Sequence, residues 1–187
     1  RFNGVGTFQH ITAANSPSPY RDDLFGEQSS RHLFISAPAY NVVRRELLQP
    51  SGVSFTSSRP EGADGPEFLA SRDAWFRPIT LRTGPDGALW IADFYRLVLE
   101  HPQWIPNDVE QRIDLRSGSD RGRIYRVYRD GTNPRPIASL NNLNIAQLVA
   151  SLDSPGGWTR DTAQRLLLHR GDPKAAQPLT KLLQTST

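Results

Sequence analysis

The sequence contains neither cysteine nor methionine among its 187 residues. The absence of cysteine excludes disulfides, thiolate metal sites, thiol nucleophiles and the Cys-x-x-Cys-His attachment of haem c within this chain. Because a translated protein starts with methionine and this chain begins with Arg1, we expect it to be an internal fragment of a longer protein. The lack of a signal peptide in these residues therefore carries no information on where the protein resides.

The sequence also lacks a long apolar run and a long block of one charge. No stretch is long and apolar enough to cross a bilayer, so we expect no membrane segment in this chain. The net charge is +3, but 22 basic and 19 acidic residues are intermixed, which argues against nucleic acid as a partner. No glycine-rich phosphate loop and no Gly-x-Ser-x-Gly motif is present.

Proline and glycine are frequent, with 15 and 14 residues, which predicts many turns and short elements. Pro85-Asp86-Gly87 is a strong turn signal, because Pro presets φ at the first corner and Gly tolerates positive φ later. The turn separates the β-prone residues 79–82 from residues 88–92, whose two faces are both apolar and should both be buried. Residues 124–128 form a third β-rich run. Together these runs predict most of one β-propeller blade.

The earlier residues predict the preceding blade. Residues 32–36 and 41–47 have the composition of two strands separated by Pro38, and residues 53–56 alternate as in a strand with one wet face. Residues 59–66 are rich in Pro, Gly and acidic residues, so we expect an exposed loop there. We therefore expect residues 1–131 to be the C-terminal blades of a β-propeller.

The pattern changes after a linker at residues 132–139. From Ile145 to Leu152, apolar residues recur with the i, i+3, i+4, i+7 spacing of an amphipathic helix. Similar stripes predict helices over about 158–170 and 174–184. This repetition predicts the first HEAT-like helical repeats over residues 140–187. The expected fold class is mainly β with an α-helical C-terminal part, and because neither architecture is closed we expect exposed strand edges.

An insertion too long for a blade turn follows the central strand, and long loops in compact domains are often functional. The candidate catalytic residues there are Glu100 and His101, because a carboxylate beside an imidazole can orient a base or bind sugar hydroxyls. The candidate substrate-binding residues are Asp93, Tyr95, Arg96 and Arg121. We expect His101 to be oriented by Glu100 or by a nearby backbone carbonyl. The alternative is structural, with Asp93 ending the strand and His101-Pro102 setting the loop geometry.

For Arg121 and for three tryptophans, a binding role and a structural role are also both open. Arg121 could reach an anionic ligand, but the neighbouring Asp120 favours a structural ion pair. Trp75, Trp90 and Trp104 could stack on a sugar, but buried packing between blades is favoured. The 4 histidines of the sequence show no metal-binding spacing, so we expect no metal site.

Several of these segments resemble one known family. They are Phe76-Arg77-Pro78, residues 83–95, Glu100-His101-Pro102-Gln103-Trp104-Ile105 and residues 120–127. They are similar to the large membrane-bound dehydrogenase-like, haem-binding proteins of planctomycetes and verrucomicrobia. The resemblance covers about Tyr20 to Leu183, and the Glu-His-Pro-Gln-Trp insertion is its most specific part.

The resemblance implies a β-propeller similar to glucose and sorbosone dehydrogenases, followed by HEAT-type repeats and then by a c-type cytochrome domain outside this chain. It implies a periplasmic or extracellular enzyme that oxidises a sugar or alcohol. Pyrroloquinoline quinone and haem c would serve the full-length protein, and no cofactor is assigned to this chain itself.

Two departures from the family pattern affect this interpretation. Where the family has Cys-Glu-Pro-Val-His-Asn, residues 36–41 read Ser-Ala-Pro-Ala-Tyr-Asn, and Asn15 stands at a second expected cysteine. A disulfide implied by the resemblance is therefore missing. The glutamate and histidine are replaced by Ala37 and Tyr40, which favours an alternative function. In that alternative the chain belongs to a non-catalytic propeller and HEAT scaffold that binds a protein or polysaccharide.

Overall fold

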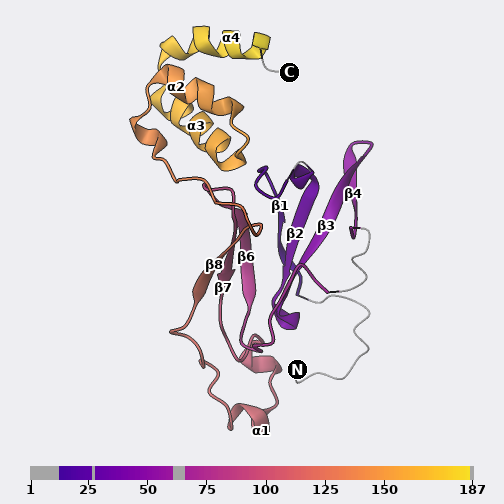
Figure 1. Cartoon of the computed structure of the whole chain (residues 1–187). Coiled ribbons are helices and arrows are strands. Elements are labelled where there is room, and N and C mark those ends of the chain that lie inside the picture. Colours follow the sequence, from indigo (N-terminus) through magenta and orange to yellow (C-terminus); the bar gives the residue numbers. More distant parts are fainter. Residues whose placement is uncertain (1–12, 27, 61–65, 186–187) are drawn as a thin grey trace. The chain divides into compact units, whose positions relative to one another are not determined.

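The computed structural model of the chain describes residues 13–26, 28–60 and 66–185. These residues form open antiparallel β-sheets followed by helices in the C-terminal part (Figure 1). The chain divides into two compact units. The sheet unit comprises residues up to Pro19, Arg31–Arg82 and Trp90–Arg126, and the helical unit comprises Tyr20–Ser30, Thr83–Leu89 and the residues from Val127 onward.

The first sheet has the strand order β1-β2-β3-β4, and β5 pairs with β3. The strands are β1 (Asn15–Pro19), β2 (His32–Ala37), β3 (Val42–Ser51), β4 (Ser54–Ser58) and β5 (Leu69–Ala70). Phe34 of β2 and Val43 of β3 are fully buried and anchor the sheet in the core. The strands predicted on both sides of Pro38 are confirmed, and this proline begins the short 3-10 turn between them.

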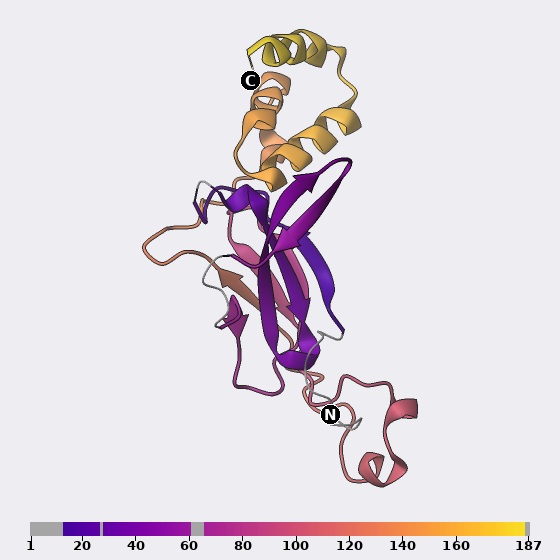
Figure 2. The same cartoon turned by 90° about the vertical axis from the view of Figure 1, so that its right-hand side faces the viewer.

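The hairpin of β3 and β4 is long, and its tip projects beyond β1 and β2 (Figures 1 and 2). The expectation that residues 53–56 have one buried face is wrong, because every residue of β4 is exposed. Phe55 is 64% exposed, since it pairs with Pro50 in the exposed end of β3. Alternation along a sequence indicates a strand, but it does not reveal whether another element covers the apolar face.

The second sheet has the order β6-β7-β8, with β6 (Pro78–Thr83), β7 (Leu89–Asp93) and β8 (Arg123–Val127). The three predicted strands are therefore present. Leu81 and Ile91 are fully buried, whereas Trp90 is only half-buried. The expected burial of β7 on both faces is thus complete for one face only.

The C-terminal part contains α2 (Ile145–Ala150), α3 (Gly157–Arg170) and α4 (Ala176–Thr185), close to the predicted ranges. Asn144 and Gln147 form a capping box at the start of α2, which satisfies amide groups that have no partner within the helix. The apolar stripes meet in a small core of Leu140, Leu148 and Ala163, with Leu143, Leu152, Trp158, Leu166 and Leu167 packed against it. Among the described residues, no helix combines the length and apolar character needed to cross a membrane.

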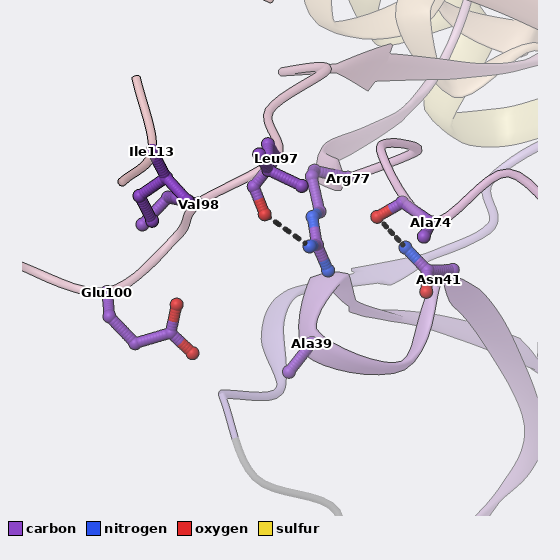
Figure 3. Close-up of a pocket in the computed structure, with 8 residues that line it drawn as sticks. All are labelled: Ala39, Asn41, Ala74, Arg77, Leu97, Val98, Glu100 and Ile113. Carbon is purple, nitrogen blue, oxygen red and sulfur yellow. Dashed lines mark hydrogen bonds between the residues drawn. The ribbon is translucent and has the colours of Figure 1, made fainter. Parts of the chain in front are cut away.

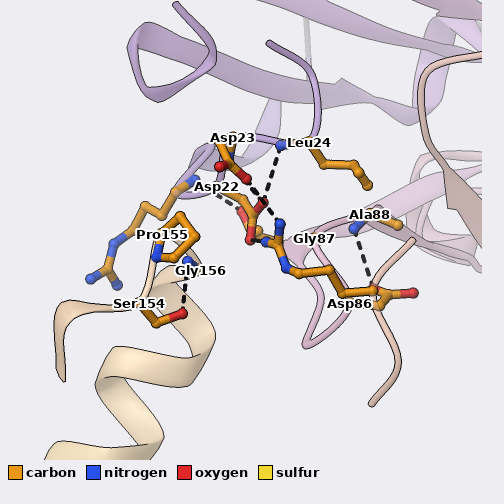
Figure 4. Close-up of polar contacts among 12 residues, drawn as sticks. Asp22, Asp23, Leu24, Asp86, Gly87, Ala88, Ser154, Pro155 and Gly156 are labelled. Atoms are coloured by element: carbon orange, nitrogen blue, oxygen red, sulfur yellow. Dashed lines mark hydrogen bonds and ion pairs between the residues drawn. The ribbon is translucent and has the colours of Figure 1, made fainter. Parts of the chain in front are cut away.

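An ion pair with a buried carboxylate holds distant parts of the helical unit together (Figure 4). The Asp22 side chain is 2% exposed and pairs with the guanidinium of Arg135, which also donates to Asp23 Oδ1 at 2.9 Å. Asp22 Oδ1 accepts from the backbone amides of Asp23 at 2.8 Å and Leu24 at 3.1 Å. The backbone amide of Arg135 donates to the carbonyl of Asp86 at 2.9 Å. Residues from three separate parts of the sequence are thereby joined.

The start of α3 is attached to the same loop. The Gly157 amide donates to the Arg21 carbonyl at 2.6 Å, and a Cβ on Gly157 would lie only 2.8 Å from that oxygen. The Arg21 guanidinium donates to both carboxylate oxygens of Asp161, at 2.5 and 2.9 Å. This hydrogen-bonded pairing lowers the pKa of Asp161 below its ordinary value. A glycine is thus needed at position 157 because the backbone of another segment approaches so closely.

Candidate functional site

Asp93, at the end of β7, is tied into the backbone. Its Oδ1 accepts from the amides of Arg77 at 2.8 Å and Tyr95 at 2.9 Å. Its side chain is fully buried, and Oδ2 lies 3.7 Å from Nε of Arg123. The two amides satisfy Oδ1, whereas Oδ2 accepts no hydrogen bond within the described residues and has only the charge of this arginine nearby. These contacts are those expected from the structural interpretation, in which Asp93 ends the strand.

Tyr95 and Arg96 attach the insertion to the sheet unit. Tyr95 has a positive φ of 49°, and its carbonyl would lie 2.4 Å from a Cβ on Gly118, so this approach requires a glycine. The Tyr95 ring lies beneath the Arg123 guanidinium, with 3.7 Å to the ring centroid. Arg96 donates to the Gly118 carbonyl at 2.5 Å. Both candidate residues therefore stabilise the base of the insertion.

His101 lies at the start of the 3-10 turn Pro102–Trp104 and acts as its N-cap. Its Nδ1 accepts from the Gln103 amide at 3.3 Å, and the residue is exposed. The ring is thus oriented by a backbone amide, and not by Glu100 or by a carbonyl as expected. Pro102 fits the first position of the turn because it has no amide hydrogen to satisfy. A short helix, α1 (Asn107–Glu110), follows this turn.

Glu100 lies at a cavity of about 360 Å³ in the sheet unit (Figure 3). The polar residues at its wall are Asn41, Arg77 and Glu100, and the apolar residues include Ala39, Leu97 and Val98. The Glu100 side chain accepts from the Leu99 amide at 3.3 Å. His101 does not line this cavity. The structure therefore separates the two candidate catalytic side chains.

Arg77 forms the rigid part of the wall. Its guanidinium donates to the carbonyls of Arg96 at 2.9 Å, Pro38 at 2.9 Å and Leu97 at 3.0 Å, and the last of these bonds is visible in Figure 3. Burial lowers the pKa of Arg77, and the negative charge of Glu100 partly opposes this shift. Because the guanidinium is held by backbone carbonyls, it joins three segments and contributes fixed positive charge to the cavity.

Asn41 completes the wall from the turn between β2 and β3. It has a left-handed backbone, with φ of 60°, a conformation that asparagine tolerates better than most residues. Its side-chain amide donates to the carbonyls of Phe76 at 2.5 Å and Ala74 at 3.2 Å. The side-chain nitrogen is therefore committed to the fold, while the side-chain oxygen can accept a hydrogen bond.

The remaining candidates lie outside the cavity wall. Arg121 is exposed, and its Nε is 3.9 Å from Asp120 Oδ1, which is the pairing that the sequence favours. Trp104 is 62% exposed, so the expectation that it packs between blades is wrong; it lies in a surface turn. Within residues 13–26, 28–60 and 66–185, no cluster of three His, Cys, Asp or Glu residues is placed to hold a metal ion.

These features define an antiparallel β-sheet protein with a helical C-terminal part and, in its sheet unit, a small cavity with both polar and apolar residues at its wall. Residues 1–131 match the family model described as Domain of unknown function (DUF7133), and the chain belongs to this family. The searches of curated proteins and of solved structures gave no match.

Proposed function

We propose that this chain belongs to a propeller and HEAT-repeat scaffold whose cavity binds a sugar or a similar polyhydroxylated ligand without oxidising it. The observation that carries the proposal is the separation of Glu100, which lines the cavity, from His101, which caps a surface turn. The residues at which the resemblance implies a glutamate and a histidine are Ala37 and Tyr40. Among the described residues, the cavity wall therefore holds the carboxylate of Glu100 and no histidine.

The arrangement of the resembling segments supports a ligand site at this cavity. Ala39 and Asn41 come from the altered Cys-Glu-Pro-Val-His-Asn segment, Arg77 from Phe76-Arg77-Pro78, and Glu100 from the insertion. Segments far apart in the sequence thus contribute to one wall. Such convergence of polar groups on a pocket with apolar lining is typical of ligand sites.

The chemistry of the cavity favours hydroxyl groups. Arg77 uses one donor of each guanidinium nitrogen, and Asn41 its side-chain nitrogen, on backbone carbonyls. The polar groups left to a ligand are the acceptor oxygens of Asn41 and Glu100 and the remaining N–H groups of Arg77. A ligand rich in hydroxyl donors complements these acceptors. The negative charge of Glu100 at this wall disfavours pyrroloquinoline quinone, because that cofactor itself carries carboxylates. The quinone and haem c would be held by other residues of the full-length protein.

Replacing Glu100 by glutamine should weaken the binding of a neutral sugar about tenfold, because a charged acceptor makes the stronger hydrogen bond. Isothermal titration calorimetry with a panel of neutral mono- and disaccharides measures this change. The melting temperature should stay within a few degrees, since Glu100 is exposed.

Glu110→Gln is the matched control, because Glu110 lies in α1 and outside the cavity wall. It should leave sugar binding unchanged. Equal effects of the two substitutions, or binding that neither alters, would reject the cavity as the sugar site.

A second candidate function is a dehydrogenase-like enzyme outside the cytoplasm that passes electrons to a cytochrome c domain. Its support is the resemblance of the insertion, together with the position of Glu100 at the cavity. In such an enzyme, one carboxylate or imidazole would take the hydroxyl proton of the sugar or alcohol as a cofactor accepts hydride.

The His101→Ala variant of the full-length protein separates the two functions. The enzyme proposal expects dye-linked sugar oxidation to fall more than about tenfold at an almost unchanged melting temperature. The scaffold proposal expects no oxidation by either protein. Under both proposals the lost N-cap of the turn lowers the stability by at most about 1 kcal/mol. Activity assays and thermal unfolding of the same preparations decide between these outcomes.

A further inference from the structure

Glu100 is the carboxylate of the cavity wall, and no cation lies beside it. Its side chain accepts one hydrogen bond, from the Leu99 amide at 3.3 Å, and within the described part of the chain it forms no ion pair. In Figure 3 the side chain extends from the insertion toward Ala39 and the Arg77 guanidinium. Because an ionised carboxylate can accept several hydrogen bonds, Glu100 keeps both its charge and most of its acceptor capacity for a ligand.

The other carboxylates near the wall have an arginine beside them. Burial lowers the pKa of Arg77, and nearby negative charges oppose this shift; they belong to Glu100, Asp73 and Asp93. The Oδ2 atoms of Asp73 and Asp93 lie 3.8 and 3.7 Å from nitrogens of the Arg123 guanidinium, which offsets part of their charge. Among the described residues, Glu100 is therefore the one of these three carboxylates whose charge is left to a ligand.

Arg77 does not neutralise Glu100. No hydrogen bond or ion pair joins the two side chains in the described residues, and each guanidinium nitrogen donates to a backbone carbonyl, of Arg96, Pro38 or Leu97. These carbonyl oxygens partly offset the positive charge of the guanidinium. The N–H groups that remain on Arg77 can donate to the oxygen of a ligand hydroxyl group.

The apolar residues of the wall suit the ring of a small ligand. Leu97, Val98 and Ile113 line the cavity, and Val98 is 8% exposed. The C–H groups on the face of a sugar ring can pack against such residues while the polar substituents bond to the polar groups of the wall. The cavity volume of about 360 Å³ lies in the range of small-molecule sites, roughly 300–1,000 Å³.

We propose that the ligand of this cavity is an amino sugar with a free ammonium group, an inference that rests on the sugar-binding function proposed above. The ammonium group pairs with the Glu100 carboxylate, and hydroxyl groups accept from Arg77 and donate to the side-chain oxygen of Asn41. The apolar ring face packs against Val98 and Ile113. Because hydrogen bonds between charged groups are about twice as strong as neutral ones, the amino sugar binds more tightly than its neutral parent.

The test compares matched pairs of sugars by isothermal titration calorimetry of the 187-residue chain. The pairs are glucosamine with glucose, galactosamine with galactose and mannosamine with mannose, at a slightly acidic pH at which the amino sugars are charged. Within each pair an ammonium group replaces one hydroxyl group, so the ratio of the two dissociation constants isolates the charge. In at least one pair the amino sugar should bind about tenfold more tightly. This ratio should fall as salt is added, because Glu100 is exposed.

Three variants assign the preference to Glu100. Glu100→Gln keeps an oxygen acceptor of similar size and removes the charge, so the ratio should fall to about one. Glu100→Asp keeps the charge and should keep a preference for the amino sugar. Glu110→Gln removes a carboxylate outside the cavity wall and should leave both dissociation constants unchanged.

The outcomes separate this inference from the proposed function. Equal affinity for the amino sugar and its parent in every pair would overturn the inference and leave sugar binding by the cavity intact. Binding of none of these sugars would reject the proposed function itself. A preference for the amino sugar that persists in Glu100→Gln would place the ammonium group elsewhere and overturn the assignment. Tighter binding of a free amino acid such as serine than of any amino sugar would identify a zwitterionic ligand instead.

Discussion

Replacing Arg135 by alanine should lower the free energy of unfolding of the helical unit by about 3 kcal/mol, because it leaves a buried carboxylate without its cation. The Asp22 side chain is 2% exposed and that of Arg135 is 36% exposed. The partial exposure of the arginine, and the two backbone amides that remain on Asp22, place the effect at the low end for a broken buried pair. Urea unfolding followed by circular dichroism at 222 nm measures it.

Two further variants show whether the uncompensated charge is the cause. Arg165→Ala removes an arginine from the exposed side of α3 and should cost less than about 0.5 kcal/mol. Adding Asp22→Asn to Arg135→Ala should recover part of the lost stability, because the buried group is then neutral. If the double variant is less stable than Arg135→Ala alone, the effect comes from lost packing around the arginine and not from the charge.

The strands and helices were predictable because their signals are local. The turn at Pro85-Asp86-Gly87 and the apolar stripe from Ile145 to Leu152 depend on residues a few positions apart. The set of chain segments that make up the helical unit was not predictable in this way. Asp22 and Arg135 belong to distant segments, and a sequence with many arginines and acidic residues does not reveal which of them pair. The inclusion of Tyr20–Ser30 in that unit therefore needed the structure.

In the candidate site, too, contacts between distant residues could not be predicted from local patterns. Asp93 stood out in the sequence because it follows a central strand, and its hydrogen bonds to two backbone amides follow from that position. The adjacency of Glu100 and His101 in sequence suggested a pair, yet the 3-10 turn uses the His101 ring as a cap. Arg77 was missed as a cavity residue, because its role depends on the carbonyls of three separate residues. Its signal in the sequence, an arginine before Pro78, is too common to be read alone.

Replacing both Asn15 and Ser36 by cysteine should create a disulfide that stabilises the sheet unit by about 3 kcal/mol, the value typical for closing a loop of roughly this length. The two residues are register partners in β1 and β2. Ser36 Oγ donates to the Asn15 backbone oxygen at 3.0 Å and also bonds to its side-chain oxygen. Their side chains therefore share one face of the sheet, close to the geometry that a disulfide needs.

The oxidised double variant should contain no free thiol, and its melting temperature should exceed that of the reduced form by roughly 6–12 °C. Thiol titration and thermal unfolding with and without reductant measure the two quantities. Asn15→Cys alone is the control and should show no such difference as a monomer. Persistent free thiols under an oxidant would contradict the register of β1 against β2. A disulfide would support the proposed relation to the dehydrogenase-like family, because the resemblance places its two expected cysteines at these positions.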